Sequence, residues 1–231
     1  MSGVGARPDR RRFLAGSLAA SLWRARPRAE LAVGVIGLGA RGEEHVLALQ
    51  TMPLVRVVAL CDVDESALAR AARTLREAGQ RPALHGDFRH LLERDDVEAV
   101  TLATPDHWHA LQTILACQAG KDVYVESPAS HSFLEGERML EAARAGARLV
   151  QCGFQARSSP ALRAALEWLR AGELGALRLV RAVCFHARPP LGRVSGNQRI
   201  PESLDYDLWC GPAPLAPLRR ARLHQDWRWS W

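Results

Sequence analysis

The stretch 31-LAVGVIGLGARGEEHVLALQ-50 decides the fold. Its apolar start predicts a β-strand over 31–36, and helical periodicity follows over 43–50. Between them Gly37, Gly39 and Gly42 form a GxGxxG pattern. A second apolar run over 54–60 is followed by Asp62, twenty residues after Gly42. Glycines that follow a strand, open a helix and precede an acidic residue at this distance are typical of a dinucleotide-binding βαβ unit.

Each residue of this turn has an expected role. Gly37 allows the tight turn, Gly39 lets the backbone approach a pyrophosphate, and Gly42 lets the helix pack close to the strand. Leu38 and Arg41 belong to the same cofactor-binding turn, whose helix N-terminus offers N–H groups to phosphates. Asp62 is expected to bind the adenosine ribose diol and to repel a 2′-phosphate, so NAD is expected over NADP, although Arg41 partly offsets that repulsion. The alternative is a glycine turn without a ligand.

Strands alternating with helices predict an α/β fold, with an N-terminal Rossmann doubly wound parallel sheet. Further strands are expected at 84–86, 99–103, 123–125 and 149–152. Further helices are expected at 64–78 with Asp64 as N-cap, and at 88–93, 107–118 and 133–145. After Gly153 the pattern changes to a helix at 161–171, a strand at 177–185 and a proline loop at 210–217. We therefore expect a signal segment at 1–29, the Rossmann domain at 30–152, and an incomplete α/β open-sheet substrate domain at 153–231.

Two segments follow later strands and should lie at the carboxyl edge of the sheet, where ligands bind in such folds: 104-TPDHWHA-110 and 126-ESPAS-130. His107 and His109 begin a helix, where residues two apart do not share a face, so a metal site is not expected. One of these histidines is expected near the nicotinamide; the alternative is helix capping and packing.

Charge and cysteine spacing exclude other classes. The net charge of +6 resides in residues 1–29, which hold seven arginines and one acid, and the remaining 24 basic and 24 acidic residues balance. No nucleic-acid footprint is therefore expected. The five cysteines are widely spaced without a CxxC pair, so neither a metal knuckle nor a disulfide framework is indicated.

The leader, 9-DRRRFLAGSLAASLW-23, fits a twin-arginine export signal, with Asp9 where Ser or Thr is usual. We expect export to the periplasm, with membrane contact only during export. The alternative is a frayed basic N-terminus.

Together, the glycine fingerprint, 104-TPDHWHA-110, 119-AGKDVYVESPAS-130, 150-VQCGFQAR-157 and 207-DLWCGPAP-214 resemble the Gfo/Idh/MocA oxidoreductases, above all their exported twin-arginine branch. The resemblance implies NAD(P)-linked hydride transfer on a sugar, inositol or related polyol. By position, the resemblance implies that one set of residues lines the cofactor site. It also implies that Gln155 and Arg157 lie in a segment near the substrate cleft. The cofactor-lining set comprises Gly37, Gly39, Gly42, Asp62, Thr104, His109, Glu126 and Pro128, to which we add His107.

Two departures from the family pattern bear on catalysis. The family's Glu-Lys-Pro is Glu126-Ser127-Pro128 here, and serine lacks the ammonium that stabilises an alkoxide or relays a proton. Lys121, the only lysine, lies six residues before Ser127, roughly 20 Å away along a strand. The family's Asp…His catalytic segment lies beyond the tryptophan-rich 223-LHQDWRWSW-231, where this chain stops.

The catalytic candidates are therefore Ser127 and His109, in an oxidoreductase of impaired activity. Two alternatives stay open: an NAD-dependent glycosidase, in which transient sugar oxidation enables bond cleavage, and a non-catalytic NAD-binding remnant. The oligomeric state is left open.

Overall fold

The computed structural model describes residues 30–183, 196–220 and 222–227. The expected twin-arginine segment, residues 1–29, lies outside these described residues, as do Trp229 and Trp231.

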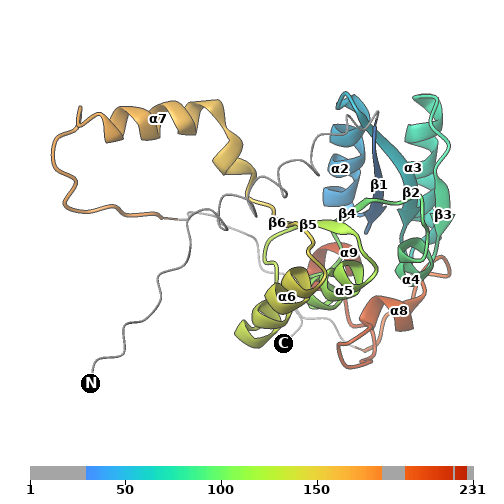
Figure 1. The fold of residues 1–231 in the computed structure, drawn as a ribbon. Coiled ribbons are helices and arrows are strands. Elements are labelled where there is room, and N and C mark those ends of the chain that lie inside the picture. The colour runs from blue at the N-terminus through green and yellow to red at the C-terminus, as the bar shows by residue number, and fades with distance from the viewer. Residues whose placement is uncertain (1–29, 184–195, 221, 228–231) are drawn as a thin grey trace, which may run out of the picture.

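A six-stranded sheet forms the centre of the fold, and all its strand pairs are parallel (Figure 1). The strand order is β3-β2-β1-β4-β5-β6. The strands are β1 (Leu31–Ile36), β2 (Val55–Cys61), β3 (Ala83–His85), β4 (Ala99–Leu102), β5 (Asp122–Val125) and β6 (Val150–Cys152). β2 and β3 are added on one side of β1, and β4, β5 and β6 on the other. The strand order therefore reverses between β1 and β4, as in the doubly wound sheet of a Rossmann domain. The expected fold class is therefore confirmed.

Helices cover both faces of the sheet. They are α2 (Ala40–Thr51), α3 (Glu65–Glu77), α4 (Phe88–Leu92), α5 (Asp106–Gln118) and α6 (Phe133–Ala145). One buried cluster joins Val46 of α2 and Leu75 of α3 to Val35 of the sheet. The other joins α4, α5 and α6 to the opposite face around Ile36 and Val125. Because both faces are covered, the strands are nearly all apolar.

Local signals in the sequence explain where these elements begin and end. Asp64 caps α3 as expected, since its Oδ1 accepts from the N–H of Ser66 at 2.9 Å. Ser132 and Glu135 form a capping box at the start of α6. Lys121 precedes β5, and its buried Nζ donates to the carbonyl of Arg94 at 2.7 Å. The only lysine therefore links the turn that follows α4 to the start of β5, far from the carboxyl edge of the sheet.

Residues after β6, where the second domain is expected, begin with two helices. The 3-10 helix η1 (Gln155–Ser158) follows β6, and α7 (Pro160–Arg170) stands away from the sheet (Figure 1). The expected strand over 177–185 is wrong for residues 177–183, which carry no regular structure. A strand needs a neighbour to accept its hydrogen bonds, and these residues are exposed. Residues 184 and 185 lie outside the described part.

The chain then returns to pack against the Rossmann domain. The returning segment, residues 196–227, contains α8 (Tyr206–Cys210) and α9 (Leu223–Asp226). Leu204, Trp209 and Leu223 form a buried cluster that packs with Val63. The N–H of Asp205 donates to the carbonyl of Val63 at 3.0 Å. The returning segment is thereby attached at the carboxyl end of β2.

Within the described residues, no helix combines the length and the apolarity that a membrane crossing requires.

Candidate functional site

The glycine turn at the carboxyl end of β1 has the geometry that a pyrophosphate site requires. Gly37 has φ +85°, and a Cβ there would lie 2.6 Å from the backbone nitrogen of Thr104. A Cβ on Gly42 would lie 1.8 Å from the carbonyl oxygen of Gly37. A Cβ on Gly39 would meet nothing within 4 Å. The fold itself therefore excludes a side chain at Gly37 and Gly42, whereas the space beside Gly39 is free for a ligand.

Asp62 lies at the carboxyl end of β2, directly beside this turn. Its Oδ2 accepts from the N–H of Leu38 at 2.5 Å, and its Oδ1 accepts from the N–H of Asp64 at 2.8 Å. Burial raises the pKa of the Asp62 carboxyl, although the two N–H donors act in the opposite direction. Asp62 thus closes the turn. Arg41 points from the first turn of α2 and pairs with Glu44.

The returning segment reaches this end of the site through His224. The ring Nε2 of His224 lies 3.0 Å from Oδ2 of Asp64. Burial alone would raise the pKa of Asp64, but hydrogen bonds from Ser66, Ser203 and His224 lower it overall. A negatively charged Asp64 therefore holds α9 beside the end of β2.

At the other end of the site, His109 is a bridge between two loops. The ring is 1% exposed. Its Nδ1 lies 2.7 Å from the carbonyl oxygen of Pro128, and its Nε2 lies 2.8 Å from that of Thr104. A neutral ring donates to one of these oxygens and a protonated ring to both. With both nitrogens occupied, this geometry favours a positioning role, and the catalytic role expected for His109 stays an untested prediction.

Glu126 follows β5 and pairs with a residue that sequence reasoning missed. Its Oε1 lies 2.9 Å from Nε2 of His45 on α2. The His45 ring meets the ring of Tyr124 edge-on at 5.5 Å. A Cβ on Gly153 would lie 3.1 Å from Glu126 Oε1. The carboxylate is thus enclosed on one side by α2 and β6, while Ser127 beside it is exposed.

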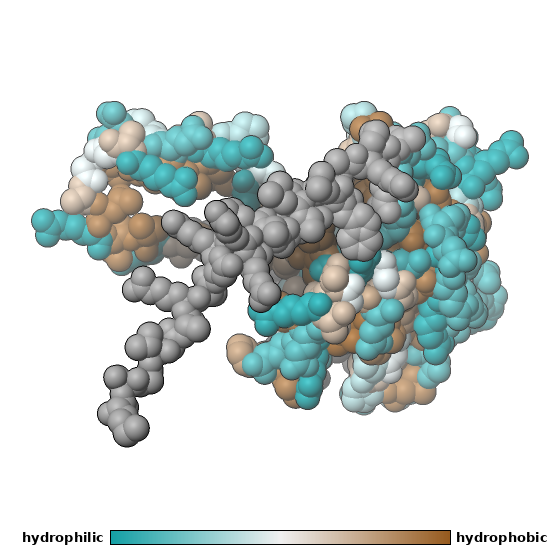
Figure 2. Space-filling model, viewed as in Figure 1, coloured by the Kyte–Doolittle hydropathy of each residue, from teal (hydrophilic) through white to brown (hydrophobic). Residues whose placement is uncertain are grey.

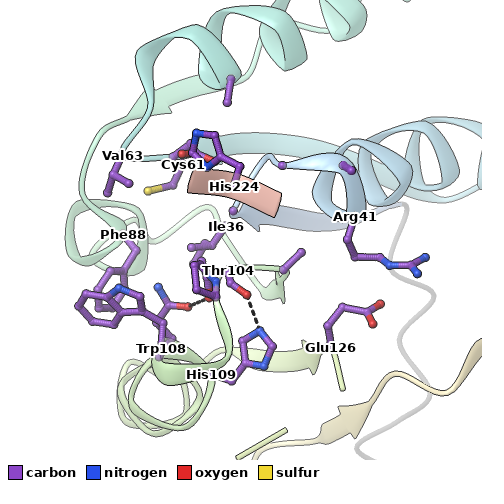
Figure 3. A pocket seen from close by; sticks show the side chains of 18 of the residues that line it. Ile36, Arg41, Cys61, Val63, Phe88, Thr104, Trp108, His109, Glu126 and His224 are labelled. Atoms are coloured by element: carbon purple, nitrogen blue, oxygen red, sulfur yellow. Dashed lines mark hydrogen bonds between the residues drawn. The ribbon is translucent and has the colours of Figure 1, made fainter. Parts of the chain in front are cut away.

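A cavity of about 660 Å³ runs along the carboxyl edge between these two ends (Figure 3). Several sequence-predicted residues line it: Gly37, Gly39, Arg41, Asp62, Thr104, His109, Glu126, Ser127 and Gln155. Others do not: Leu38, Gly42, His107, Pro128 and Arg157. Leu38 and Gly42 are buried in the turn itself. Pro128 contributes its carbonyl to His109.

His107 lies beneath the returning segment instead of facing the cavity. Its Nε2 is 3.0 Å from the carbonyl oxygen of Trp209, and its ring meets Trp209 and Trp227 edge-on. Trp108 beside it donates from Nε1 to the same carbonyl at 3.1 Å. The cofactor contact expected for His107 is not what this geometry shows, because the imidazole is occupied in attaching α8 to α5.

The two substrate candidates lie on η1 and are exposed. Gln155 reaches the main cavity, whereas Arg157 lines a smaller one of about 370 Å³ with Tyr124 and Cys152. Lining residues that the sequence did not reveal include Trp108, His224 and Trp227. Within the described ranges, no group of three or more His, Cys, Asp or Glu side chains is placed to hold a metal ion.

The cavity fits a dinucleotide chemically. It offers the start of α2 with open space beside Gly39, a carboxylate at each end, and apolar surface from Ile36, Phe88 and Trp108. Pyrophosphate binding at a helix N-terminus uses the N–H groups of the first turn.

Comparisons with known proteins agree with this geometry. Residues 31–154 match a family model described as "Oxidoreductase family, NAD-binding Rossmann fold". Residues 192–231 match one described as "Oxidoreductase family, C-terminal alpha/beta domain".

Among curated proteins, the chain is 35% identical to inositol 2-dehydrogenase 1 of Saccharopolyspora erythraea over 159 residues, 68% of this chain and 46% of that protein. It is 42% identical over 102 residues to a glycosyl hydrolase family 109 protein of the same organism, covering 42% of this chain and 22% of that protein. Among solved structures, scyllo-inositol dehydrogenase from Lactobacillus casei with bound NAD(H) and scyllo-inositol superposes with a TM-score of 0.58 at 26% identity, over 63% of this chain and 42% of that one. The chain spans less than half the length of each of these relatives.

Proposed function

Since the chain belongs to the Gfo/Idh/MocA oxidoreductases, a family with an NAD-binding Rossmann domain, we propose that it binds NAD along the carboxyl edge of its sheet. The observation that carries this proposal is one continuous cavity that joins the glycine turn and Asp62 to Thr104 and Glu126. In doubly wound sheets a dinucleotide crosses the sheet at the point where the strand order reverses, which here lies between β1 and β4.

Each end of the cavity then has a role. The N–H groups at the start of α2 hold the pyrophosphate beside Gly39. Asp62 accepts hydrogen bonds from the adenosine ribose. Beyond β4, Thr104 and the loop fixed by His109 line the nicotinamide half.

We propose that the reaction is hydride transfer to or from a sugar, inositol or related polyol. Bound NAD would supply the hydride acceptor, and the chain's residues would place the substrate hydroxyl against it. Similarity to inositol dehydrogenases supports a polyol. Gln155 at the cavity mouth is the candidate for contact with substrate hydroxyls, and Arg157 lies further out. Ser127 provides no ammonium, so we expect slow turnover.

The first test is a thermal melt of the chain with NAD and with NADP. At a hundredfold excess over Kd, a ligand of the folded state adds about 2.7 kcal/mol, which is roughly 5–10 °C for a domain of this size. We expect the larger shift with NAD. In Asp62→Ser the two shifts should become similar, because the charge that repels a 2′-phosphate is gone. A cooperative melt without any shift would contradict the proposal.

A second test restores the ammonium at the nicotinamide end. We expect Ser127→Lys to raise polyol-dependent NADH formation by about 10²-fold or more, the contribution of a positioned acid–base group. Ser130→Lys, in the same loop but absent from the cavity lining, is the matched control. Equal rates for both variants would show that the absence of a lysine at position 127 is not what limits turnover.

A glycosidase is the second candidate, favoured by the 42% identity to a glycosyl hydrolase family 109 protein. In this reaction bound NAD would be reduced and reoxidised within one turnover. Release of nitrophenol from aryl glycosides that depends on catalytic NAD would support it. No release with either oxidised or reduced cofactor would exclude it.

We also propose export by the twin-arginine route, on the sequence of the leader alone. Replacing Arg10, Arg11 and Arg12 by lysine should retain a reporter fusion in the cytoplasm.

A further inference from the structure

The pair formed by Glu126 and His45 is held from several sides. The two side chains are 13% and 11% exposed, and 2.9 Å separates Oε1 from Nε2. Tyr124 stacks edge-on against the imidazole, and Gly153 leaves just enough space for the carboxylate. The pair joins α2 to the end of β5, so its geometry is set by the packing of the fold.

The other ring nitrogen of His45 indicates the charge of the pair. Nδ1 is buried and has no hydrogen-bond partner among the described residues. A proton on Nδ1 would be a buried donor without an acceptor, which is costly. The favoured form is therefore a neutral ring that carries its proton on Nε2 and donates it to Glu126. The pair then has the single negative charge of the carboxylate.

The position of the pair decides which part of a dinucleotide would meet this charge. Asp62, at the end of β2, marks the adenosine half, and the glycine turn after β1 marks the pyrophosphate. Glu126 follows β5, on the opposite side of β1, and lines the cavity. The carboxylate therefore faces the half that holds the nicotinamide.

We propose that Glu126, positioned by His45, selects the oxidised over the reduced nicotinamide by charge. This inference rests on the proposed NAD site. The oxidised ring is cationic and the reduced ring is neutral, while the rest of the two cofactors is the same. A carboxylate facing the nicotinamide attracts only the cationic form. His45 keeps the charge uncompensated because it donates a hydrogen bond without adding a positive charge.

The neighbouring charges leave this effect in place. Arg41 lines the same cavity but pairs with Glu44. Tyr124 and Cys152, the other titratable groups next to Glu126, have pKa values raised by burial and by the Glu126 charge, so both are neutral near pH 7. Among these described side chains, none that adjoins the Glu126 carboxylate therefore carries a positive charge that offsets it.

The test measures Kd for NAD+ and NADH by titration calorimetry on the full chain and its variants. In Glu126→Gln we expect the ratio Kd(NAD+)/Kd(NADH) to rise roughly tenfold, which corresponds to about 1.4 kcal/mol. His45→Gln keeps an N–H donor near the Nε2 position and should leave the ratio within about twofold, whereas His45→Phe should raise it roughly threefold through loss of the hydrogen bond. Glu137→Gln and His90→Ala, both exposed, are matched controls with an unchanged ratio.

Melting curves establish that each variant is folded. A ratio unchanged in a folded Glu126→Gln overturns the inference and leaves NAD binding intact. Failure of the native chain to bind either form overturns the proposed function and the inference together.

A second readout needs no cofactor. Imidazole nitrogen shifts by NMR, assigned by comparison with His45→Gln, should show the His45 proton on Nε2. A proton on Nδ1 would contradict the pair as described.

Discussion

At the scale of single residues, two glycines of the turn have different roles: Gly42 is required for folding, whereas Gly39 is required for binding of the cofactor. Gly39 has φ −66°, which any residue adopts, and open space beside it. We expect Gly39→Ala to melt within about 2 °C of the native chain and to lose the NAD-induced shift, because the new methyl group occupies ligand space. Gly42→Ala instead forces a Cβ against the Gly37 carbonyl and should lower the free energy of unfolding by about 1–3 kcal/mol. Melting curves with and without NAD distinguish the two effects; a shift retained in Gly39→Ala would contradict the site.

The same scale shows what sequence could predict. The glycines and Asp62 were recognisable because their spacing along the chain carries the signal. His45 was not, since its partner Glu126 lies 81 residues away and only the strand order brings them together. His107 and His109 were both assigned near the cofactor. Packing separates them: one ring lies under Trp209 and the other between two loops.

At the scale of elements, α8 and α9 depend on an imidazole that folding keeps neutral. Burial lowers the pKa of His107 below its usual 6.5, although the Trp209 carbonyl and Asp106 oppose this. The unfolded chain therefore binds more protons, and stability present above about pH 6.5 is lost as the pH falls through the lowered folded pKa. We expect Tm to fall on acidification in this range, and His107→Gln to reduce the slope. His85, whose pKa is also lowered by burial, leaves a residual slope. An undiminished slope in His107→Gln, with exposed His90→Gln as control, would refute this account.

The strands and helices of the Rossmann domain were predicted closely, because hydrophobic periodicity and caps such as Asp64 are local. The packing of the returning segment against the Rossmann domain was not predicted. Its helices are short and its proline-rich sequence carries no periodicity, so nothing local indicates that Trp209 and Leu223 bury themselves beside Val63. The strand predicted over 177–183 is wrong for a related reason. A strand needs a partner strand as well as apolar residues, and the local sequence does not show whether a partner is present.

At the scale of the whole molecule, an apolar arm extends from the folded domain. It comprises α7 and residues 174–183, and Figure 2 shows hydrophobic residues along its inner side. Leu166 and Trp168 are each 49% exposed, and Val180 is 80% exposed. Exposed apolar surface of this extent favours association. We therefore expect the chain to self-associate through this arm while the Rossmann domain stays folded.

Sedimentation velocity over a range of concentrations measures that association. Replacing Leu166 and Val180 by glutamate should weaken it at least about tenfold, since burying one such side chain contributes about 1.5–3 kcal/mol. Tm and the NAD-induced shift should stay unchanged, because neither residue belongs to the clusters around the sheet. Arg170→Glu alters charge on the same arm without removing apolar area and is the control. If the double variant associates as strongly as the native chain, the contact lies elsewhere; if Arg170→Glu weakens association equally, charge rather than apolar burial drives it.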